Sequence, residues 1–306
     1  MFPEKNNNLS IIIASHNSLK ELSLCLSSLQ SQQIPANSFQ SIEIIVVGNL
    51  SDEELIRLKE LYPTVRVLRA DPQASVPHLR SQGIREAQGD ILALLEDHCI
   101  PAPDWYRSIL SAHRSGHLVV GGTVENGSTE RIVDWAVYLF EYSTYMKPLP
   151  RGEVQQLPGN NISYNRRVLP LLKDLLEKDL WESFWHKRLL EEGICLISNP
   201  DMVVYHHKSF CIQEFWHLVR LHGHNYAVSR TFDASHKKWL WMAGVFFLPF
   251  IMWFRIGKRI LSKRRHVKKF ILASPFLLWF NIGWTLGEIT GTITKRPKPE
   301  TGWTKP

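Results

Sequence analysis

A short apolar run that ends in three ionisable side chains constrains the fold of this chain more than any other stretch. The run from Ile91 to Leu95 follows Gly89, and Glu96, Asp97 and His98 come directly after it. A run of this length behind a glycine predicts a buried strand of a parallel sheet rather than a helix. Open α/β sheets bind their ligands in the crevice beyond the carboxyl ends of such strands. The stretch therefore predicts a ligand site at the end of a buried strand.

The three ionisable side chains divide between the two faces of the predicted strand. Alternation places Glu96 and His98 on one face and Asp97 on the other. A carboxylate and an imidazole side by side can hold a divalent cation, and a cation there would neutralise a diphosphate. For these residues taken alone, a solvated corner between strand and loop is the alternative.

Apolar runs and helical patterns alternate along most of the chain. Strand-like runs occupy residues 10–14, 42–47, 65–68, 117–123 and 194–205, and helical patterns include 76–87, 129–145 and 182–192. Strands that alternate with helices imply a mostly parallel, Rossmann-like α/β sheet with helices on its faces. No GxGxxG follows the first strand, so a dinucleotide cofactor is not indicated.

The positive charge of the chain belongs to its end. The net charge is +7, yet the residues from His236 onward contain 14 Lys and Arg against 2 Asp and Glu, which leaves the preceding part mildly acidic. A basic tail on an acidic globular part favours an anionic membrane surface over nucleic acid as the partner.

Two apolar runs flank a basic segment in this tail. The pattern predicts a domain over residues 1–235 and a tail over 236–306, with helices at about 239–256 and 270–290 and a basic loop between them. Two full crossings would put the basic loop outside the cell, against the bias of Lys and Arg for the cytosolic side. We therefore expect at least one segment to be re-entrant or to lie in the membrane interface. A buried soluble hairpin is the alternative.

Six short motifs, in this order and spacing, resemble family 2 glycosyltransferases of the membrane-associated bacterial type, which have the GT-A fold. They are Ile-Ile-Ala-Ser-His-Asn17, Glu43-Ile-Ile-Val-Val47, Arg80-Ser-Gln-Gly-Ile84, Leu-Leu-Glu-Asp-His98, Pro158-Gly-Asn-Asn-Ile162 and Pro200-Asp-Met-Val-Val-Tyr-His206. The resemblance implies a GT-A domain with a hydrophobic, membrane-associated helical tail at the C-terminal end.

The resemblance assigns donor binding to the first turn and to three further positions. In the first turn, Ser15, His16 and Asn17 would hold the base and ribose, although Asn17 could simply cap a helix. Gly48 stands where the family usually has an aspartate that contacts the base, which weakens the case for a uridine nucleotide. Arg80 and Asp97 complete the donor set, with an exposed surface arginine as the alternative for Arg80.

The resemblance also assigns the metal site and the acceptor side. The family's Asp-x-Asp motif is Glu96-Asp97-His98 here, and His206 is a further candidate ligand. An imidazole in the set favours Mn²⁺ over Mg²⁺. Asn160 and Asn161 would line the acceptor side, with an ordinary polar turn as the alternative.

Glu182 takes the place of the catalytic base in the family. One carboxylate suffices, because a single acceptor hydroxyl must lose its proton. The alternative for Glu182 is a favourable charge in the first turn of a helix.

These residues together predict an inverting glycosyltransferase. It would transfer a sugar from a nucleotide-diphosphate sugar to a lipid-linked or polysaccharide acceptor, in cell-surface or secreted polysaccharide synthesis. Its catalytic domain would lie on the cytoplasmic side of the cell membrane. Two rivals remain open: a catalytically inactive scaffold of GT-A fold, favoured by the departures at Gly48, His98 and Ser183, and a nucleotidyltransferase, which would need a basic phosphate loop after the first strand.

Overall fold

A computed structural model describes residues 8–16, 19–32, 41–231 and 244–298. The chain divides into two compact units. Unit 1 comprises Met1–Glu125 and Tyr145–His206, and unit 2 comprises Asn126–Thr144 and His207–Pro306. The border that the sequence predicted near residue 235 falls among residues outside the described ranges, and the structure groups the helices before it with the tail.

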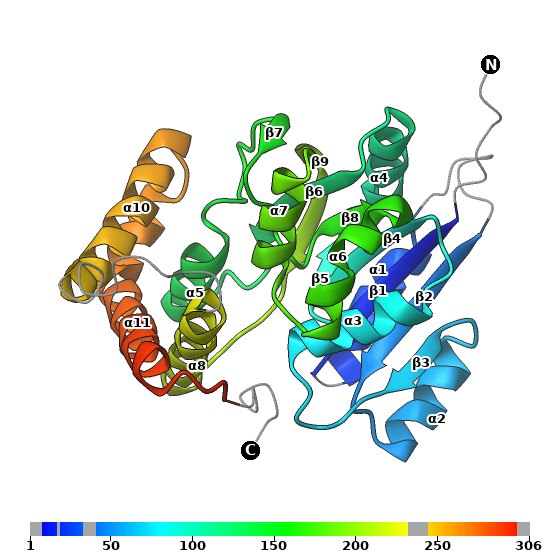
Figure 1. Cartoon of the computed structure of the whole chain (residues 1–306), viewed down its shortest axis with the longest axis horizontal. Helices are drawn as coiled ribbons and strands as arrows, with labels where there is room; N and C mark the ends of the chain where they lie inside the picture. The colour runs from blue at the N-terminus through cyan, green and yellow to red at the C-terminus, as the bar shows by residue number, and fades with distance from the viewer. Residues whose placement is uncertain (1–7, 17–18, 33–40, 232–243, 299–306) are drawn as a thin grey trace. The chain divides into compact units, whose positions relative to one another are not determined.

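The described part of unit 1 is built on a nine-stranded mixed sheet, shown in Figure 1. The strand order is β3-β2-β1-β4-β8-β6-β9-β5, with β7 also paired to β9. The strands are β1 Leu9–Ser15, β2 Ile42–Gly48, β3 Arg66–Arg69, β4 Ile91–Glu96, β5 Cys99–Pro101, β6 Val119–Asn126, β7 Gly152–Val154, β8 Ile162–Asn165 and β9 Leu196–His206.

The predicted α/β class is confirmed, and the register shows where the sheet is parallel. Strands β3, β2, β1 and β4 run parallel, whereas β8 pairs antiparallel with β4. The side chains of Ile11, Ile12 and Ile13 on β1 are fully buried, as expected for a strand covered on both faces. The sheet is therefore parallel only in the half that the Rossmann-like pattern describes, because the later strands join it antiparallel.

Helices flank this sheet on both faces (Figure 1). In unit 1 they are α1 Leu19–Gln30, α2 Asp52–Leu61, α3 Val76–Glu86, α4 Trp105–Arg114, α6 Leu169–Glu177 after the short 3₁₀ turn η1 Arg166–Val168, and α7 Glu182–Glu191. Helix α3 packs against β1 and β2, and α7 packs against β9. Two helices thereby bring their N-terminal ends to the carboxyl ends of the strands.

Unit 2 is helical in its described part. It contains α5 Ile132–Tyr142, α8 Ile212–Thr231, the short 3₁₀ turn η2 Val245–Phe247, α10 Leu248–Lys263 and α11 Val267–Thr294. Its core includes an aromatic cluster in which Phe215 packs edge-on against both Phe140 and Phe280. This cluster joins α5, α8 and α11 into one body.

The basic segment between the apolar runs differs from the expected loop. Helix α10 continues to Lys263 and α11 begins at Val267, so the Lys and Arg side chains of this segment lie mainly on the two helices. Lysine and arginine are good helix formers, and a turn with positive φ at Arg264 and His266 is enough to reverse the chain. The structure thus carries these cations on a helical hairpin.

One described helix, α11, is long and apolar enough to cross a membrane, judged by length and composition alone. It has 28 residues, whereas α10 has 16. The polar residues Asn281, Thr285, Glu288 and Thr292 of α11 are all buried. Because these four recur at helical spacing, one face of α11 is a polar seam packed inside unit 2.

Candidate active site

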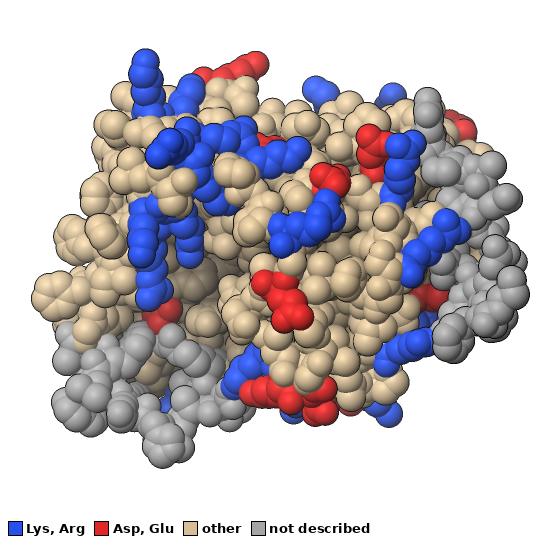
Figure 2. Space-filling model, turned by 90° about the horizontal axis from the view of Figure 1, so that it is seen from above, with Lys and Arg blue, Asp and Glu red and all other residues tan. Residues whose placement is uncertain are grey.

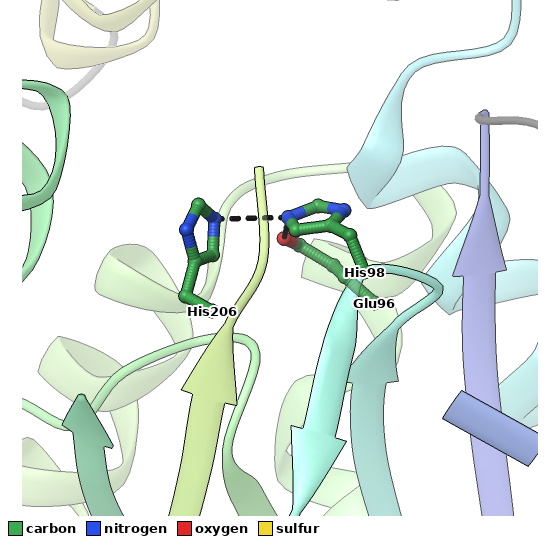
Figure 3. A group of neighbouring side chains, drawn as sticks. All are labelled: Glu96, His98 and His206. Atoms are coloured by element: carbon green, nitrogen blue, oxygen red, sulfur yellow. Dashed lines mark hydrogen bonds and ion pairs between the residues drawn. The ribbon is translucent and has the colours of Figure 1, made fainter. Parts of the chain in front are cut away.

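Three potential metal ligands meet at the end of β4. Glu96 is the last residue of β4, His98 lies in the turn before β5, and His206 ends β9, where it is the register partner of Cys99. Figure 3 shows the two imidazole rings facing each other with the carboxylate of Glu96 beside them. One ligand atom from each residue lies within 4.8 Å of the others, and all three residues are buried.

The spacing of these atoms suits a shared cation. His98 Nε2 is 2.9 Å from His206 Nε2 and 3.2 Å from Glu96 Oε2. Ligand atoms about 2.1 Å from one ion lie roughly 3 Å apart when they occupy neighbouring corners of its coordination shell. The residues present therefore fit a divalent metal held by two imidazole nitrogens and one carboxylate oxygen.

Asp97 fixes the orientation of His98 and ties it to the first strand. The other ring nitrogen of His98, Nδ1, lies 2.9 Å from Asp97 Oδ1. Asp97 Oδ2 accepts hydrogen bonds from the Ser15 hydroxyl and the His16 main-chain N–H, both at 2.9 Å. A carboxylate behind a metal-binding histidine selects the tautomer that presents the opposite nitrogen to the metal. Asp97 thus supports the candidate metal site from behind.

The electrostatics of the cluster favour positive charge. Burial opposes ionisation of Glu96, but the hydrogen bond from His98 and the charges of Arg80, His98 and His206 outweigh burial and lower its pKa from 4.5 to about 2. Burial likewise disfavours the charged form of His98, yet its hydrogen bonds to Asp97 and Glu96 raise its pKa from 6.5 to about 9. A site that holds a proton so strongly on an imidazole offers the same negative field to a metal cation.

Arg80 joins this cluster to Glu182. Its guanidinium donates from Nη2 to Glu96 Oε1 at 2.6 Å and pairs through Nη1 with Glu182 Oε1 at 2.7 Å. Arg80 is only 1% exposed, so the alternative of an exposed surface arginine is wrong. A buried guanidinium needs carboxylate partners, and two of them surround this one.

Glu182 is the first residue of α7, and its side chain is buried. Burial raises the pKa of Glu182 above its ordinary value of 4.5, although the positive charge of Arg80 opposes the shift. The first-turn position also gives the carboxylate a favourable interaction with the helix dipole. The favourable first-turn charge is therefore present, and the catalytic assignment of Glu182 stays a prediction.

The loop before β8 presses against the Arg80–Glu182 pair. A Cβ at Gly159 would lie 2.7 Å from Glu182 Oε2 and 2.9 Å from Arg80 Nη1, so only glycine fits there without a shift. The next residue, Asn160, is buried and donates from Nδ2 to Cys99 Sγ. Of the two predicted acceptor-side asparagines, Asn160 is thus the one beside this glycine.

Asn161 has a structural role. Its Nδ2 group donates to the carbonyl oxygens of Thr123 and Met202, and its Oδ1 accepts from the Trp105 indole N–H, all at 2.8 Å. The side chain is fully buried and ties α4 to the strands beside it. This geometry does not favour the predicted acceptor-side role for Asn161.

The donor-side residues of the first two strands meet where the strands end. Ser15 and Gly48 are register partners on β1 and β2. A Cβ at Gly48 would lie 2.3 Å from the Ser15 carbonyl oxygen, so an aspartate at this position would require the backbone to shift. Asn17 lies outside the described residues, so its predicted contact with the donor stays a prediction.

Sequence reasoning missed the aromatic cover of Arg80. The ring of Trp181, the N-cap residue of α7, has its centroid 6.0 Å from the Arg80 guanidinium carbon. The only indication of a role for Trp181 in the sequence is its position directly before Glu182. Nothing in the local sequence indicates that the Trp181 ring lies against Arg80 of α3.

This fold and this site define a GT-A type domain, in which the carboxyl ends of a mixed sheet carry an acidic edge that could hold a metal. Residues 10–172 match the family model described as Glycosyl transferase family 2. The chain belongs to that family, which confirms the predicted resemblance.

Relatives and solved structures agree with this assignment. The chain is 32% identical over 130 residues to the glycosyltransferase AglE of Haloferax volcanii, a match that covers 40% of this chain and 42% of that protein. It is 23% identical over 231 residues to the dolichyl N-acetyl-alpha-D-glucosaminyl phosphate 3-beta-D-2,3-diacetamido-2,3-dideoxy-beta-D-glucuronosyltransferase of Methanococcus voltae, covering 68% of this chain and 70% of that protein.

The fold also resembles that of the mannosyltransferase PcManGT from Pyrobaculum calidifontis in complex with GDP-Man and Mn²⁺. The TM-score is 0.55 with 13% sequence identity, and the match covers 95% of this chain and 88% of the other. At this identity the likeness shows the fold, and the GT-A fold class is thereby confirmed.

Proposed function

We propose that this protein is an inverting, metal-dependent glycosyltransferase of the hexosyltransferase type. It would move a sugar from a nucleoside-diphosphate sugar to an acceptor hydroxyl. The observation that carries the proposal is the buried chain of contacts from the Glu96–His98–His206 cluster through Arg80 to Glu182. A candidate metal site and a candidate base thus contact the same guanidinium, which supports placing donor and acceptor side by side.

The residues divide the chemistry between the two sugars. Glu182 accepts the proton of the acceptor hydroxyl while that oxygen bonds to the anomeric carbon of the donor. The bond from that carbon to the diphosphate oxygen breaks in the same step, and the diphosphate leaves with the bonding electrons. A single displacement of this kind inverts the anomeric configuration.

The leaving diphosphate needs positive charge, and a divalent metal would supply it. Arg80 is 1% exposed and already pairs with Glu96 and Glu182, so its predicted contact with the donor stays a prediction. A divalent metal at Glu96, His98 and His206 would neutralise developing charge on the diphosphate. Two imidazoles in the ligand set favour Mn²⁺ over Mg²⁺, which prefers oxygen ligands. The solved mannosyltransferase of similar fold also holds Mn²⁺.

We propose a lipid-linked or glycan acceptor, in the synthesis of a cell-surface or secreted polysaccharide. A relative from Methanococcus voltae is named for transfer to a dolichyl-phosphate-linked sugar, which supports the lipid-linked choice. Gly48 removes the carboxylate that relatives use on the base, so we leave the donor nucleotide open.

The direct test is a panel of nucleotide sugars assayed for release of the nucleoside diphosphate with Mn²⁺ present. We expect turnover with one donor or a small group of donors, and more turnover when a prenyl-phosphate sugar acceptor is added. A protein that shows no turnover with any donor and no metal-dependent nucleotide binding would be the inactive scaffold.

The α10–α11 hairpin supports membrane attachment. An exposed apolar face runs along η2 and α10 through Phe246, Phe247, Phe250 and Phe254. Figure 2 shows Lys and Arg side chains gathered on part of the face seen from above, and the segment of this hairpin from Arg255 to Lys269 contains eight Lys and Arg. Exposed phenyl rings beside a cluster of cations fit the surface of an anionic leaflet. Unit 2 would then bind the cytosolic leaflet, with the catalytic unit on the cytoplasmic side.

Replacing the phenyl rings should release the protein from vesicles. Phe250 is 61% exposed, and burying one such ring stabilises by about 1.5–3 kcal/mol when complete. We expect the double variant Phe250→Ser, Phe254→Ser to lower partitioning onto phosphatidylserine vesicles at least about tenfold in a flotation assay. Ile56→Ser on α2 is the matched control, because Ile56 is also 61% exposed but lies in unit 1.

The lipid composition separates this proposal from nonspecific adsorption. The native protein should bind vesicles of phosphatidylcholine alone more weakly and should be released from phosphatidylserine by salt. Equal binding to both compositions, or an Ile56→Ser loss as large as that of the double variant, would contradict it.

A further inference from the structure

Helix α6 is followed by an aspartate in a backbone conformation that usually belongs to glycine. After Glu177, the chain reverses with Asp179 in the left-handed conformation at φ 50°. The Leu180 N–H donates to the Leu175 carbonyl at 3.1 Å, and the Asp179 N–H donates to the Leu176 carbonyl at 3.3 Å. These two bonds define a Schellman motif, in which glycine is the preferred residue at the left-handed position.

An aspartate at that position is less favourable for the backbone than glycine. Any side chain in the left-handed region meets a steric cost that glycine avoids, although Asp and Asn tolerate it better than most. The contact that the Asp179 side chain makes can offset this backbone cost.

The Asp179 carboxylate binds a histidine on α3. Asp179 Oδ2 lies 2.7 Å from His78 Nδ1, and His78 precedes Arg80 by two residues on that helix. About two turns beyond His78 on α3, Arg85 donates to the Leu176 carbonyl at the end of α6. Helix α3 therefore holds the end of α6 at two points.

The same helix holds the residue that follows the connection. Glu182 comes three residues after Asp179 and pairs with Arg80 at 2.7 Å. The two pairs, Asp179 with His78 and Glu182 with Arg80, fix both ends of a four-residue segment to α3. Within that segment, the Trp181 ring covers the Arg80 guanidinium.

We propose that the Asp179–His78 pair is a positioning device for Glu182. It fixes the start of α7 against α3 and so holds the Glu182 carboxylate beside Arg80, at the observed distance of 2.7 Å. The inference depends on the proposed function of Glu182 and deepens it by adding two residues that do not touch substrate. A base displaced by about 1 Å can cost as much as a hundredfold in rate.

Asp179→Gly separates positioning from stability. Glycine relieves the left-handed backbone, while the variant loses the contact with His78, so these two effects oppose each other and the midpoint of thermal unfolding should change little. We expect kcat to fall about tenfold with little change in the KM for the donor. Amide hydrogen exchange of residues 178–184 should become faster, because the segment loses one of its two ties to α3.

Three further variants make the result decisive. Asp179→Asn keeps a hydrogen-bond acceptor and tolerates the left-handed backbone, so kcat should recover to within about twofold of the native value. His78→Ala removes the partner from the other side and should reproduce the loss. Lys295→Gly is the matched control, because Lys295 is also left-handed at a helix end, with φ 53°, and belongs to unit 2.

The outcomes distinguish the two layers of the proposal. If Glu182→Gln lowers kcat but Asp179→Gly and His78→Ala both leave it within about twofold of the native value, the positioning role is overturned and the base assignment stands. If Glu182→Gln itself has no effect on an active enzyme, the proposed base is wrong. A loss of kcat in Asp179→Gly that matches a fall in its unfolding midpoint, with His78→Ala unaffected, would also overturn the positioning role.

Discussion

Glu96→Gln is expected to lower sugar transfer by about 10²–10³-fold, because it removes the anionic ligand from the candidate metal site. The amide keeps the size of the side chain and can still accept from the Arg80 guanidinium, which lies 2.6 Å from Glu96 Oε1 in the native protein. An amide oxygen is a far weaker ligand than a carboxylate, so the affinity for Mn²⁺ should fall with the rate. Transfer assays over a range of Mn²⁺ concentrations, with titration calorimetry of the metal, measure both effects.

Metal removal gives the same prediction without a substitution. Dialysis of the native protein against a chelator should abolish transfer, and added Mn²⁺ should restore it more fully than Mg²⁺. Glu60→Ala is a suitable control, because Glu60 is an exposed glutamate on α2. Unchanged Mn²⁺ affinity in Glu96→Gln, or full activity after chelation, would show that this cluster is no catalytic metal site.

The local patterns of the sequence predicted the elements that build this edge of the sheet. The run before Glu96 and the motif ending at His206 both form strands, and Figure 3 shows their end residues together. Short apolar runs and bounding glycines span only a few residues, so a single sequence can reveal them. Glu96 and His98 do lie together, with His98 Nε2 3.2 Å from Glu96 Oε2, but His98 stands in the turn after β4, so strand alternation is not what places it.

Contacts between distant segments could not be predicted in that way. In the sequence, Arg80 is simply a polar residue of a predicted helix. Its burial can be understood only once the structure places Glu96 and Glu182 around it. Glu96 lies 16 positions from Arg80 and Glu182 lies 102 positions from it, and no local pattern encodes either pairing. Asn161 is the opposite case. Its motif is polar and was predicted to line the acceptor side, whereas its side chain makes three hydrogen bonds inside the protein.

The helical hairpin of unit 2 shows a third kind of difference between the sequence-based prediction and the structure. Composition correctly located the cations but suggested a loop, because charge and apolarity were treated as separate segments. In the structure the apolar and charged side chains share α10, with Phe254 next to Arg255 on its exposed side. Helical periodicity would have shown this amphipathic pattern, had it been followed through the basic segment.

Glu182→Gln is expected to lower kcat by about 10²–10⁴-fold, the usual contribution of a general base, with a smaller effect on the KM for the donor. Glutamine fills the same space at the start of α7 but cannot take the acceptor proton. Arg80 keeps Glu96 as a charged partner in the variant, so the fold should persist. Glu191→Gln is the matched control, because Glu191 lies on the same helix with a side chain that is 57% exposed.

The pH profile tests the same assignment independently. Burial raises the pKa of Glu182 above 4.5, and a base acts only when unprotonated. The kcat/KM of the native enzyme should therefore fall as the pH drops through this raised pKa, and Glu182→Gln should lack that fall. An acidic decline of the same shape in both proteins would assign the titration to another group. If the variant also kept its kcat, Glu182 would be left with the role of a charged partner for Arg80, and the proton of the acceptor would need a different base.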